Sequence, residues 1–215
     1  MKKVLENVSA VIFDLDGLII SSETVVRDSW HEAADSHGYD MRPMYHRLIG
    51  NCHNKSNEVL FEHFGSDFPI DTLRSLVSSI VDRRIEEGEL ALKPGIVPLL
   101  EKLQSSRKKI GLATSSSMNW IERSLVPLGV AHLFEAIVTR EHVTHTKPHP
   151  ECYLTAATIL EVPPHQCLVL EDSHQGVQAA LNAKMKVCMV PDLIEPEPWV
   201  YEKGIPVLPS LEVLL

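Results

Sequence analysis

The sequence predicts an α/β protein with a doubly wound parallel sheet and a helical insertion near its amino terminus. Two observations support this prediction. Short apolar runs rich in Val, Ile and Leu alternate with helical patterns over residues 94–191, as in parallel sheets that carry helices on both faces. Residues 22–90, in contrast, space their apolar positions at three and four throughout and contain no strand-like run.

Five apolar runs are the expected strands, and the helical patterns between them are the expected crossovers. Each run is short and apolar on both faces, which is typical of interior parallel strands. Right-handed crossovers through the helices then place the strands in one parallel sheet. The expected strands are 9–13, 109–114, 136–139, 167–170 and 186–190, and the expected helices are 97–103, 118–128, 150–160 and 176–183.

The apolar spacing of the insertion predicts three helices. Gly88 and the turn at residues 93–95 mark the return to the main domain. We therefore expect a main domain at 1–20 and 91–215 and a helical subdomain at 21–90, and we interpret the proline-rich stretch 191–209 as a surface connection. The apolar positions of the three helices are Val25, Trp30, Ala33 and Ala34; Leu60, Phe61 and Phe64; and Leu73, Leu76, Val77, Ile80 and Val81.

Charge and hydropathy exclude several classes of partner. The 215 residues include 20 Lys and Arg against 29 Asp and Glu, a formal net charge of −9, so no basic field is present to bind a nucleic-acid polymer or an anionic membrane. Glu6 and Asn7 interrupt the apolar stretch that a signal peptide needs. No run approaches the ~18–20 apolar residues of a membrane helix. We expect a cytoplasmic protein.

Two acidic pairs follow predicted strands. Asp14 and Asp16 come after the first strand, and Glu171 and Asp172 end the fourth. Because the carboxyl ends of parallel strands form the binding crevice of such a sheet, the four carboxylates are expected to converge. They would raise one another's pKa values unless a cation kept them ionised, and a hard, oxygen-binding ion such as Mg²⁺ fits that requirement.

Two further strand ends supply hydroxyl groups and a positive charge. Thr114 to Ser117 follow the second strand and offer donors to a phosphate. Lys147 precedes another helix and can neutralise both a carboxylate and a phosphate oxygen. The nearby histidines His142, His145 and His149 match no metal-binding motif, and we interpret them as surface or core-edge residues. Trp30, Trp120 and Trp199 are interpreted as helix-packing or interface residues.

Four motifs occur in a fixed order: Phe13-Asp-Leu-Asp-Gly, Ala113-Thr-Ser-Ser, Lys147-Pro-His-Pro with Tyr153 after it, and Glu171-Asp-Ser with Gly176 behind it. In this order, each at a predicted strand end, they resemble the haloacid dehalogenase-like superfamily of aspartyl phosphatases and phosphomutases. The resemblance spans nearly the whole chain. It is strongest to the β-phosphoglucomutase-like and sugar-phosphatase-like subgroup, whose members carry a small helical cap after the first strand, and it implies a Rossmann-like core with an inserted α-helical cap.

The resemblance also implies a role for each polar residue of the motifs. Asp14 would be the nucleophile that forms an aspartyl-phosphate, and Asp16 would be the general acid and base. Thr114 and Ser115 would bind the transferred phosphoryl group, and Lys147 would balance its charge.

The resemblance implies one cofactor, Mg²⁺. Asp14, Asp172 and the backbone carbonyl of Asp16 would hold the ion, with Glu171 nearby. The expected substrate is a small phosphorylated metabolite, such as a sugar, polyol or nucleoside monophosphate, and the expected assembly is a monomer or weak homodimer. The residues expected to bind substrate are Ser115, Ser116, Glu23, Asn51, His53 and Lys55.

Departures from the family pattern favour hydrolysis over phosphomutation. A cap histidine that assists the acid/base residue in β-phosphoglucomutase-like proteins is matched here by Val26, and the region of a cap arginine that grips a second phosphate holds His53 and Lys55. We therefore expect a phosphatase, with a phosphomutase as the alternative. Dehalogenation is disfavoured because its enzymes do not keep the second carboxylate, Asp16. A binding module without catalysis is disfavoured because it has no need of four mutually repelling carboxylates.

Overall fold

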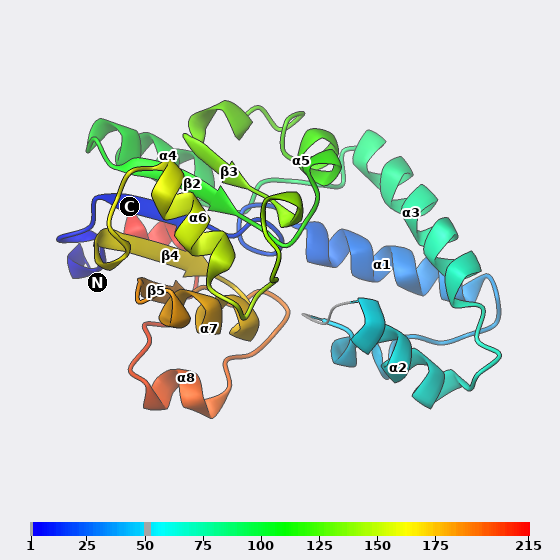
Figure 1. The fold of residues 1–215 in the computed structure, drawn as a ribbon. Helices are drawn as coiled ribbons and strands as arrows, with labels where there is room; N and C mark the ends of the chain where they lie inside the picture. Colours follow the sequence, from blue (N-terminus) through cyan, green and yellow to red (C-terminus); the bar gives the residue numbers. More distant parts are fainter. Residues whose placement is uncertain (1, 50–52) are drawn as a thin grey trace. The chain divides into compact units, whose positions relative to one another are not determined.

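The main feature of the fold is a five-stranded parallel sheet. The computed structural model describes the backbone of residues 2–49 and 53–215, and the side chains of residues 4–49 and 55–215. The predicted α/β class is confirmed, and every strand begins and ends within one residue of its expected range. In the order β3-β2-β1-β4-β5, the strands are β1 (Ala10–Phe13), β2 (Lys109–Ala113), β3 (Ala136–Val138), β4 (Cys167–Glu171) and β5 (Lys186–Met189) (Figure 1).

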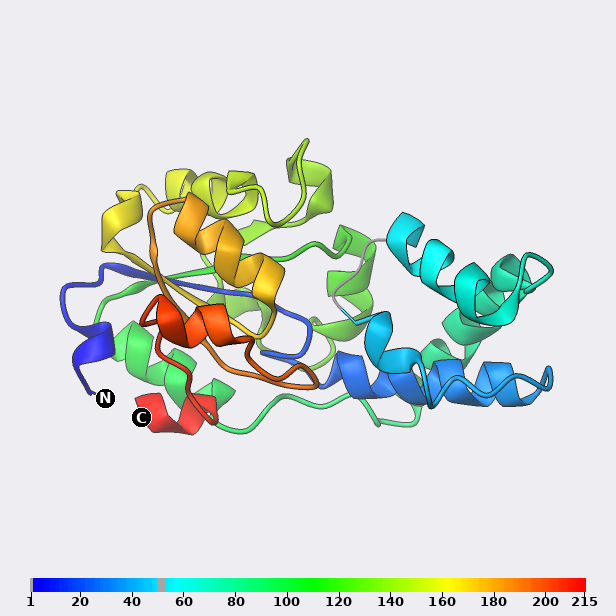
Figure 2. The same ribbon diagram turned by 90° about the horizontal axis from the view of Figure 1, so that it is seen from below.

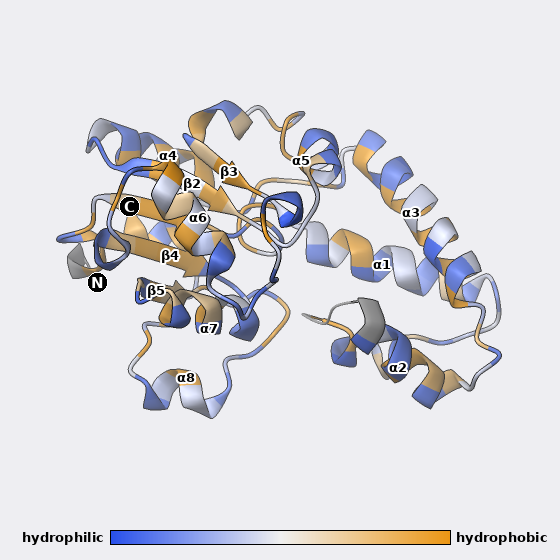
Figure 3. Cartoon of the chain, in the orientation of Figure 1, coloured by the Kyte–Doolittle hydropathy of each residue, from blue (hydrophilic) through white to orange (hydrophobic). Residues whose placement is uncertain are grey.

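Helices pack on both faces of the sheet because its strands are apolar on both sides. Ala10 and Ile12 face a core that includes residues of α6 and α7, so Val11 and Phe13 face the opposite side. There, α4 and the 3-10 segment η6 (Leu211–Leu214) pack together, and α4 contacts β2. Figure 3 shows the hydrophobic colouring on the strands. The helices of this unit are α4 (Ile96–Ser105), α5 (Met118–Ser124), α6 (Glu151–Ile159), α7 (His174–Asn182) and α8 (Pro198–Glu202).

The chain divides into two compact units, residues 1–21 with 92–215 and residues 22–91. The second unit consists of α1 (Ser22–Asp35), α2 (His53–Phe64) and α3 (Ile70–Glu86) with their connections. Helices α1 and α3 pack against each other, and Glu32 of α1 forms ion pairs with Arg83 (2.7 Å) and Arg84 (2.9 Å) of α3. None of the helices among residues 2–49 and 53–215 is long and apolar enough to cross a membrane.

The stretch 191–209 is more than the surface connection we expected. It contains α8, and Val207 forms a parallel bridge with Met189 at the end of β5. Val200, Ile205 and Leu208 are buried, because apolar residues stand between the prolines and pack under the sheet's edge. The chain then ends in η6 near the amino-terminal segment η1 (Lys2–Leu5), as Figure 2 shows.

The strand order places a topological switch point at β1. The chain proceeds from β1 to β2 and β3 on one side of the sheet, and β4 and β5 lie on the other. Such a reversal leaves a crevice at the carboxyl ends of the two central strands. In the register between β1 and β4, Phe13 lies opposite Leu170, and the amide of Asp14 donates to the carbonyl of Leu170 at 3.0 Å. The motifs that follow β1 and β4 therefore meet in this crevice.

Candidate active site

A buried turn fixes the two carboxylates that follow β1. Leu15 and Ile19 are fully buried, and the amide of Ile19 donates to the carbonyl of Leu15 at 2.9 Å. Gly17 turns the chain with a φ of +78°, a conformation that favours glycine. Asp14 and Asp16 are thus held on a rigid turn at the end of the central strand.

Lys147 joins three strand ends. Its Nζ donates to Asp14 Oδ1 at 2.5 Å, to Glu171 Oε1 at 2.8 Å and to the carbonyl of Ala113 at 3.0 Å. The side chain is buried and its ammonium lies 4.8 Å from the ring centre of Tyr153. Three acceptors match the three donors of an ammonium group, so Lys147 is fixed in position beside Asp14.

Glu171 is fully buried and is held by protein donors on both carboxylate oxygens. Besides Lys147, Oε1 accepts from the Tyr153 hydroxyl at 2.9 Å, and Oε2 accepts from the amide (2.7 Å) and the hydroxyl (2.9 Å) of Ser173. A Cβ at Gly176 would lie 1.5 Å from Oε1, so a glycine is required there. We expected Glu171 near the metal, but its contacts fit a residue that positions Lys147.

The three charges of this cluster shift one another's protonation. Burial raises the pKa of Asp14 to about 7, although the Lys147 ammonium opposes that shift. Burial alone would lower the pKa of Lys147, but Asp14 and Glu171 together raise it well above its usual value. Burial would likewise raise the pKa of Glu171, but Lys147 and Ser173 lower it. Lys147 is therefore cationic and Glu171 is ionised. The charged form of Asp14 is disfavoured because burial removes its hydration.

Two donors hold the carboxylate of Asp16. The indole Nε1 of Trp120 donates to Oδ1 at 2.9 Å, and the hydroxyl of Ser116 donates to Oδ2 at 2.6 Å. Trp120 is thus more than the helix-packing residue we interpreted it to be, because α5 directs its indole N–H toward the turn after β1. Ser116, expected to bind substrate, contacts Asp16. A tryptophan six residues after the Thr114 hydroxyl was the only signal in the sequence.

The hydroxyl loop after β2 has several internal contacts. Thr114 is buried, and its Oγ1 accepts the amide of Ser116 at 3.0 Å. Ser117 is the N-cap of α5 and accepts the amide of Trp120 at 3.2 Å. Ser115 is exposed. The loop is therefore pre-formed, with Thr114 at its base and Ser115 open to a ligand.

Carboxylate oxygens converge beside Gly17. A Cβ at this position would lie 2.3 Å from Asp172 Oδ2 and 3.3 Å from Asp192 Oδ2. Asp192 Oδ1 pairs with Lys93 Nζ at 2.5 Å, while its Oδ2 is buried and lacks a hydrogen-bond partner within the described part of the chain. Hard oxygen donors that converge with an unsatisfied carboxylate oxygen fit Mg²⁺. Sequence reasoning missed Asp192, which follows β5 without a recognisable motif.

The residues expected to bind substrate from the insertion belong to the second unit. Glu23 is half-buried in the first turn of α1. Lys55 is exposed and pairs with Glu58 at 3.2 Å. His53 is the first residue of α2, but its side chain lies outside the described residues, as does the whole of Asn51.

A family model for haloacid dehalogenase-like hydrolases matches residues 11–190, a span that runs from β1 past β5 and holds every motif of the site. The chain belongs to this family. The expectation from the motifs is confirmed, and the protein is an enzyme with the phosphatase-type chemistry of its relatives. The match covers most of the chain, including the helical insertion.

Individual relatives resemble the chain over most of its length. YhcW of Bacillus subtilis (strain 168) is 35% identical over 87% of this chain and 85% of its own. The fructose-1-phosphate phosphatase YqaB of Escherichia coli (strain K12) is 31% identical over 84% of this chain and 95% of its own. Among solved structures, β-phosphoglucomutase of Clostridium difficile is similar with a TM-score of 0.74 and 27% identity, over 97% of this chain and 93% of the other.

Proposed function

We propose that the protein is a Mg²⁺-dependent phosphatase that hydrolyses a small phosphorylated carbohydrate through an aspartyl-phosphate on Asp14. The observation that carries this proposal is the buried cluster in which Lys147 holds Asp14 beside Glu171. The carbohydrate is supported by the name of YqaB, which acts on fructose 1-phosphate. We further propose that residues 22–91 form the cap and that Glu23, Asn51, His53 and Lys55 contact the leaving group, since the phosphate end of the substrate is served by the core.

The first chemical step transfers the phosphoryl group to Asp14. A carboxylate oxygen of Asp14 attacks phosphorus as the bond to the leaving oxygen breaks, and Asp16 donates a proton to that oxygen, which leaves as an alcohol. Lys147 fixes the orientation of the attacking carboxylate and offsets negative charge on the phosphoryl oxygens. Thr114 and Ser115 lie on the loop that would receive those oxygens.

The second step returns Asp14 to its starting state. Asp16, now ionised, takes a proton from a water molecule as its oxygen attacks phosphorus, and the acyl-phosphate bond breaks to release inorganic phosphate. Because Asp16 gives one proton to the leaving alcohol and then takes another from water, its carboxyl group must be held in place through both steps. Trp120 and Ser116 supply that restraint through their hydrogen bonds.

Asp14, Asp172 and the backbone carbonyl of Asp16 are the residues that would hold Mg²⁺. When bound, the ion supplies electrostatic stabilisation of the transferring phosphoryl group. Burial disfavours the charged form of Asp14, and a bound cation would offset that cost together with Lys147.

The direct test compares Asp14→Asn with the exposed Asp67→Asn as a control. We expect the first variant to lose hydrolysis of p-nitrophenyl phosphate and of fructose 1-phosphate, and the second to retain both. EDTA should abolish the activity of the wild type, and Mg²⁺ should restore it. Retained hydrolysis in Asp14→Asn would refute the covalent mechanism.

Similarity to β-phosphoglucomutase favours one second candidate, a phosphomutase. The two reactions are separated by incubation with glucose 1-phosphate while both glucose 6-phosphate and inorganic phosphate are measured. A phosphatase releases inorganic phosphate in proportion to substrate consumed. Accumulation of glucose 6-phosphate without inorganic phosphate would replace our proposal by the mutase.

A further inference from the structure

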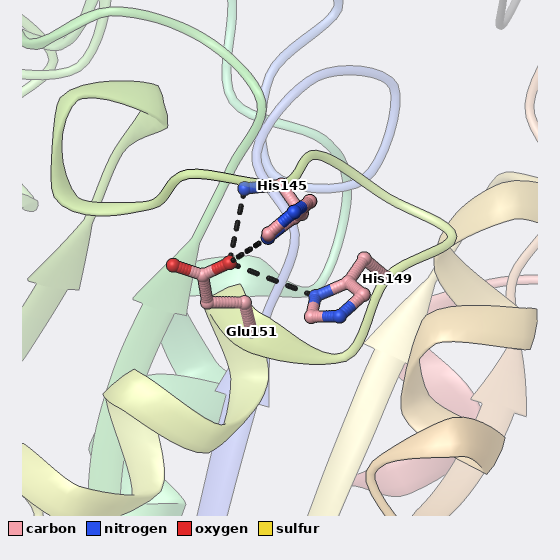
Figure 4. Close-up of side chains that lie close together, drawn as sticks. All are labelled: His145, His149 and Glu151. Atoms are coloured by element: carbon pink, nitrogen blue, oxygen red, sulfur yellow. Dashed lines mark hydrogen bonds and ion pairs between the residues drawn. The ribbon is translucent and has the colours of Figure 1, made fainter.

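Two histidines of the loop before α6 lie together with Glu151, the first residue of that helix. The Nδ1 of His145 lies 3.0 Å from Glu151 Oε2, and the Nδ1 of His149 lies 3.6 Å from the same oxygen. Figure 4 shows the three side chains close together, and their potential ligand atoms all lie within 4.8 Å of one another. This group is separate from the carboxylates of the candidate active site, and no residue of the proposed reaction belongs to it.

The backbone of the loop holds Glu151 in place. One oxygen accepts the amide of Thr144 at 2.7 Å, and the other accepts the amide of His145 at 2.9 Å. These two backbone hydrogen bonds, one to each carboxylate oxygen, fix the orientation of Glu151. Metal-binding carboxylates are commonly oriented by such hydrogen bonds from groups that do not themselves contact the ion.

The distances suit a tetrahedral ion with nitrogen and oxygen ligands. Bonds of about 2.0–2.1 Å from Zn²⁺ to imidazole nitrogen and carboxylate oxygen place neighbouring ligand atoms roughly 3.3 Å apart in a tetrahedron. The distances from Glu151 Oε2 to the two Nδ1 atoms, 3.0 and 3.6 Å, lie on either side of that value, and all three ligand atoms lie within 4.8 Å of one another. Both imidazoles are at least half exposed, so an ion can enter from solvent. Imidazole ligands favour Zn²⁺, Ni²⁺ and Cu²⁺ over Mg²⁺.

We propose that His145, His149 and Glu151 form a binding site for a divalent transition-metal ion of the Zn²⁺ type, in addition to the Mg²⁺ site. His142, the third histidine of this stretch, is not among the converging ligand atoms, and its Nδ1 contacts the amide (3.1 Å) and hydroxyl (2.9 Å) of Thr139. The ion's ligands are the Nδ1 atoms of His145 and His149 and a carboxylate oxygen of Glu151, with the proton of each neutral imidazole on Nε2.

The site brackets Lys147. The turn between His145 and His149 carries Lys147, whose ammonium reaches Asp14, and the amide of His149 closes this turn on the carbonyl of Thr146 at 3.0 Å. An ion bound by both histidines connects the two ends of the turn. The ion would therefore stabilise the closed conformation of the loop that carries Lys147, because it binds that conformation and not an opened one.

The test measures Zn²⁺ affinity of the full-length, untagged protein in excess Mg²⁺, by competition with a chromophoric chelator. Excess Mg²⁺ occupies the carboxylate site, so the titration reports the histidine site. The variants are His145→Ala, His149→Ala and, as a matched control, the exposed His165→Ala. Cu²⁺ electron paramagnetic resonance on the same proteins reports nitrogen ligands directly.

We expect the wild type and His165→Ala to bind one Zn²⁺ per chain and to show nitrogen coupling to Cu²⁺. Each of the other two variants should lose at least about tenfold in affinity, since even an outer-sphere change costs about 10- to 100-fold. Zn²⁺ should raise the melting temperature of the wild type more than that of His149→Ala. Equal Zn²⁺ affinity in the wild type and His149→Ala would overturn the proposal.

Discussion

Replacement of Trp120 by Phe tests the restraint on the proposed acid/base residue. Phe preserves most of the aromatic packing but removes the indole N–H that donates to Asp16 Oδ1 at 2.9 Å. A hydrogen bond to a charged acceptor contributes about 1.5–3 kcal/mol, which corresponds to about 10- to 150-fold in rate. Because the Ser116 hydroxyl still holds the other oxygen at 2.6 Å, we expect the lower end, about tenfold.

The loss of activity in Trp120→Phe should depend on the leaving group of the substrate. An alkyl alcohol needs a proton from Asp16 as it departs, whereas p-nitrophenol leaves as a stable anion. The value of kcat/KM reports the steps through formation of the phospho-enzyme, before Asp16 acts as a base. We therefore expect Trp120→Phe to lower kcat/KM for fructose 1-phosphate by about tenfold and for p-nitrophenyl phosphate by less than about twofold.

A matched control is available in Trp199→Phe, which removes an indole N–H that donates to Glu197 at 2.7 Å near α8. It should leave kcat/KM unchanged for both substrates. An equal loss on both substrates in Trp120→Phe would show general damage to the site. No loss on either substrate would show that the hydrogen bond to Asp16 does not serve the proton transfer.

Three further predictions concern stability, pH and metal affinity. Gly176→Ala should destabilise the fold by about 3–5 kcal/mol in urea unfolding, because its Cβ would displace the buried carboxylate of Glu171 and break an ion pair. The pKa of Glu141 is about 2, below its usual 4.5, chiefly because its carboxylate accepts a hydrogen bond from the Thr139 hydroxyl. The ionised carboxylate therefore stabilises the folded state fully above pH 4.5, and this contribution is lost as the pH falls toward 2. Glu141→Gln should therefore unfold at lower urea than the wild type at neutral pH, with a gap that closes over that range; a constant gap would contradict this. Asp192→Asn should weaken Mg²⁺ binding several-fold in calorimetry, since it removes a charge that faces the carboxylate cluster, and unchanged affinity would exclude Asp192 from the ion's surroundings.

The strands and the meeting of the carboxylates could be predicted because both follow from simple rules. An apolar run such as residues 10–13 has no stable place outside a covered sheet. Once the strands are parallel, Asp14 and Glu171 must come to the same edge, and Lys147 at a neighbouring strand end can reach both. Periodicity and local chain direction are sufficient for these features.

Contacts that depend on the rotation of a helix or the path of a loop could not be predicted. A tryptophan that packs a helix and one that donates to Asp16 look the same in sequence, and only the placement of α5 after the Ser117 cap separates Trp120 from Trp199. Glu151 meets His145 because the intervening loop turns back on itself, which no helical or strand spacing encodes. The pairing of Val207 with Met189 similarly depends on tertiary packing.

The central position of β1 has a consequence for how the enzyme is made. Ala10 pairs with Lys109 on one side and with Cys167 on the other, so β1 must wait until β4 has been synthesised before its second edge is covered. Such non-local pairing slows folding and leaves an apolar strand open to aggregation during synthesis. A chain that stops before β4 lacks Glu171 and Asp172 and leaves one edge of β1 unpaired, so we expect such a chain to be inactive and prone to aggregation.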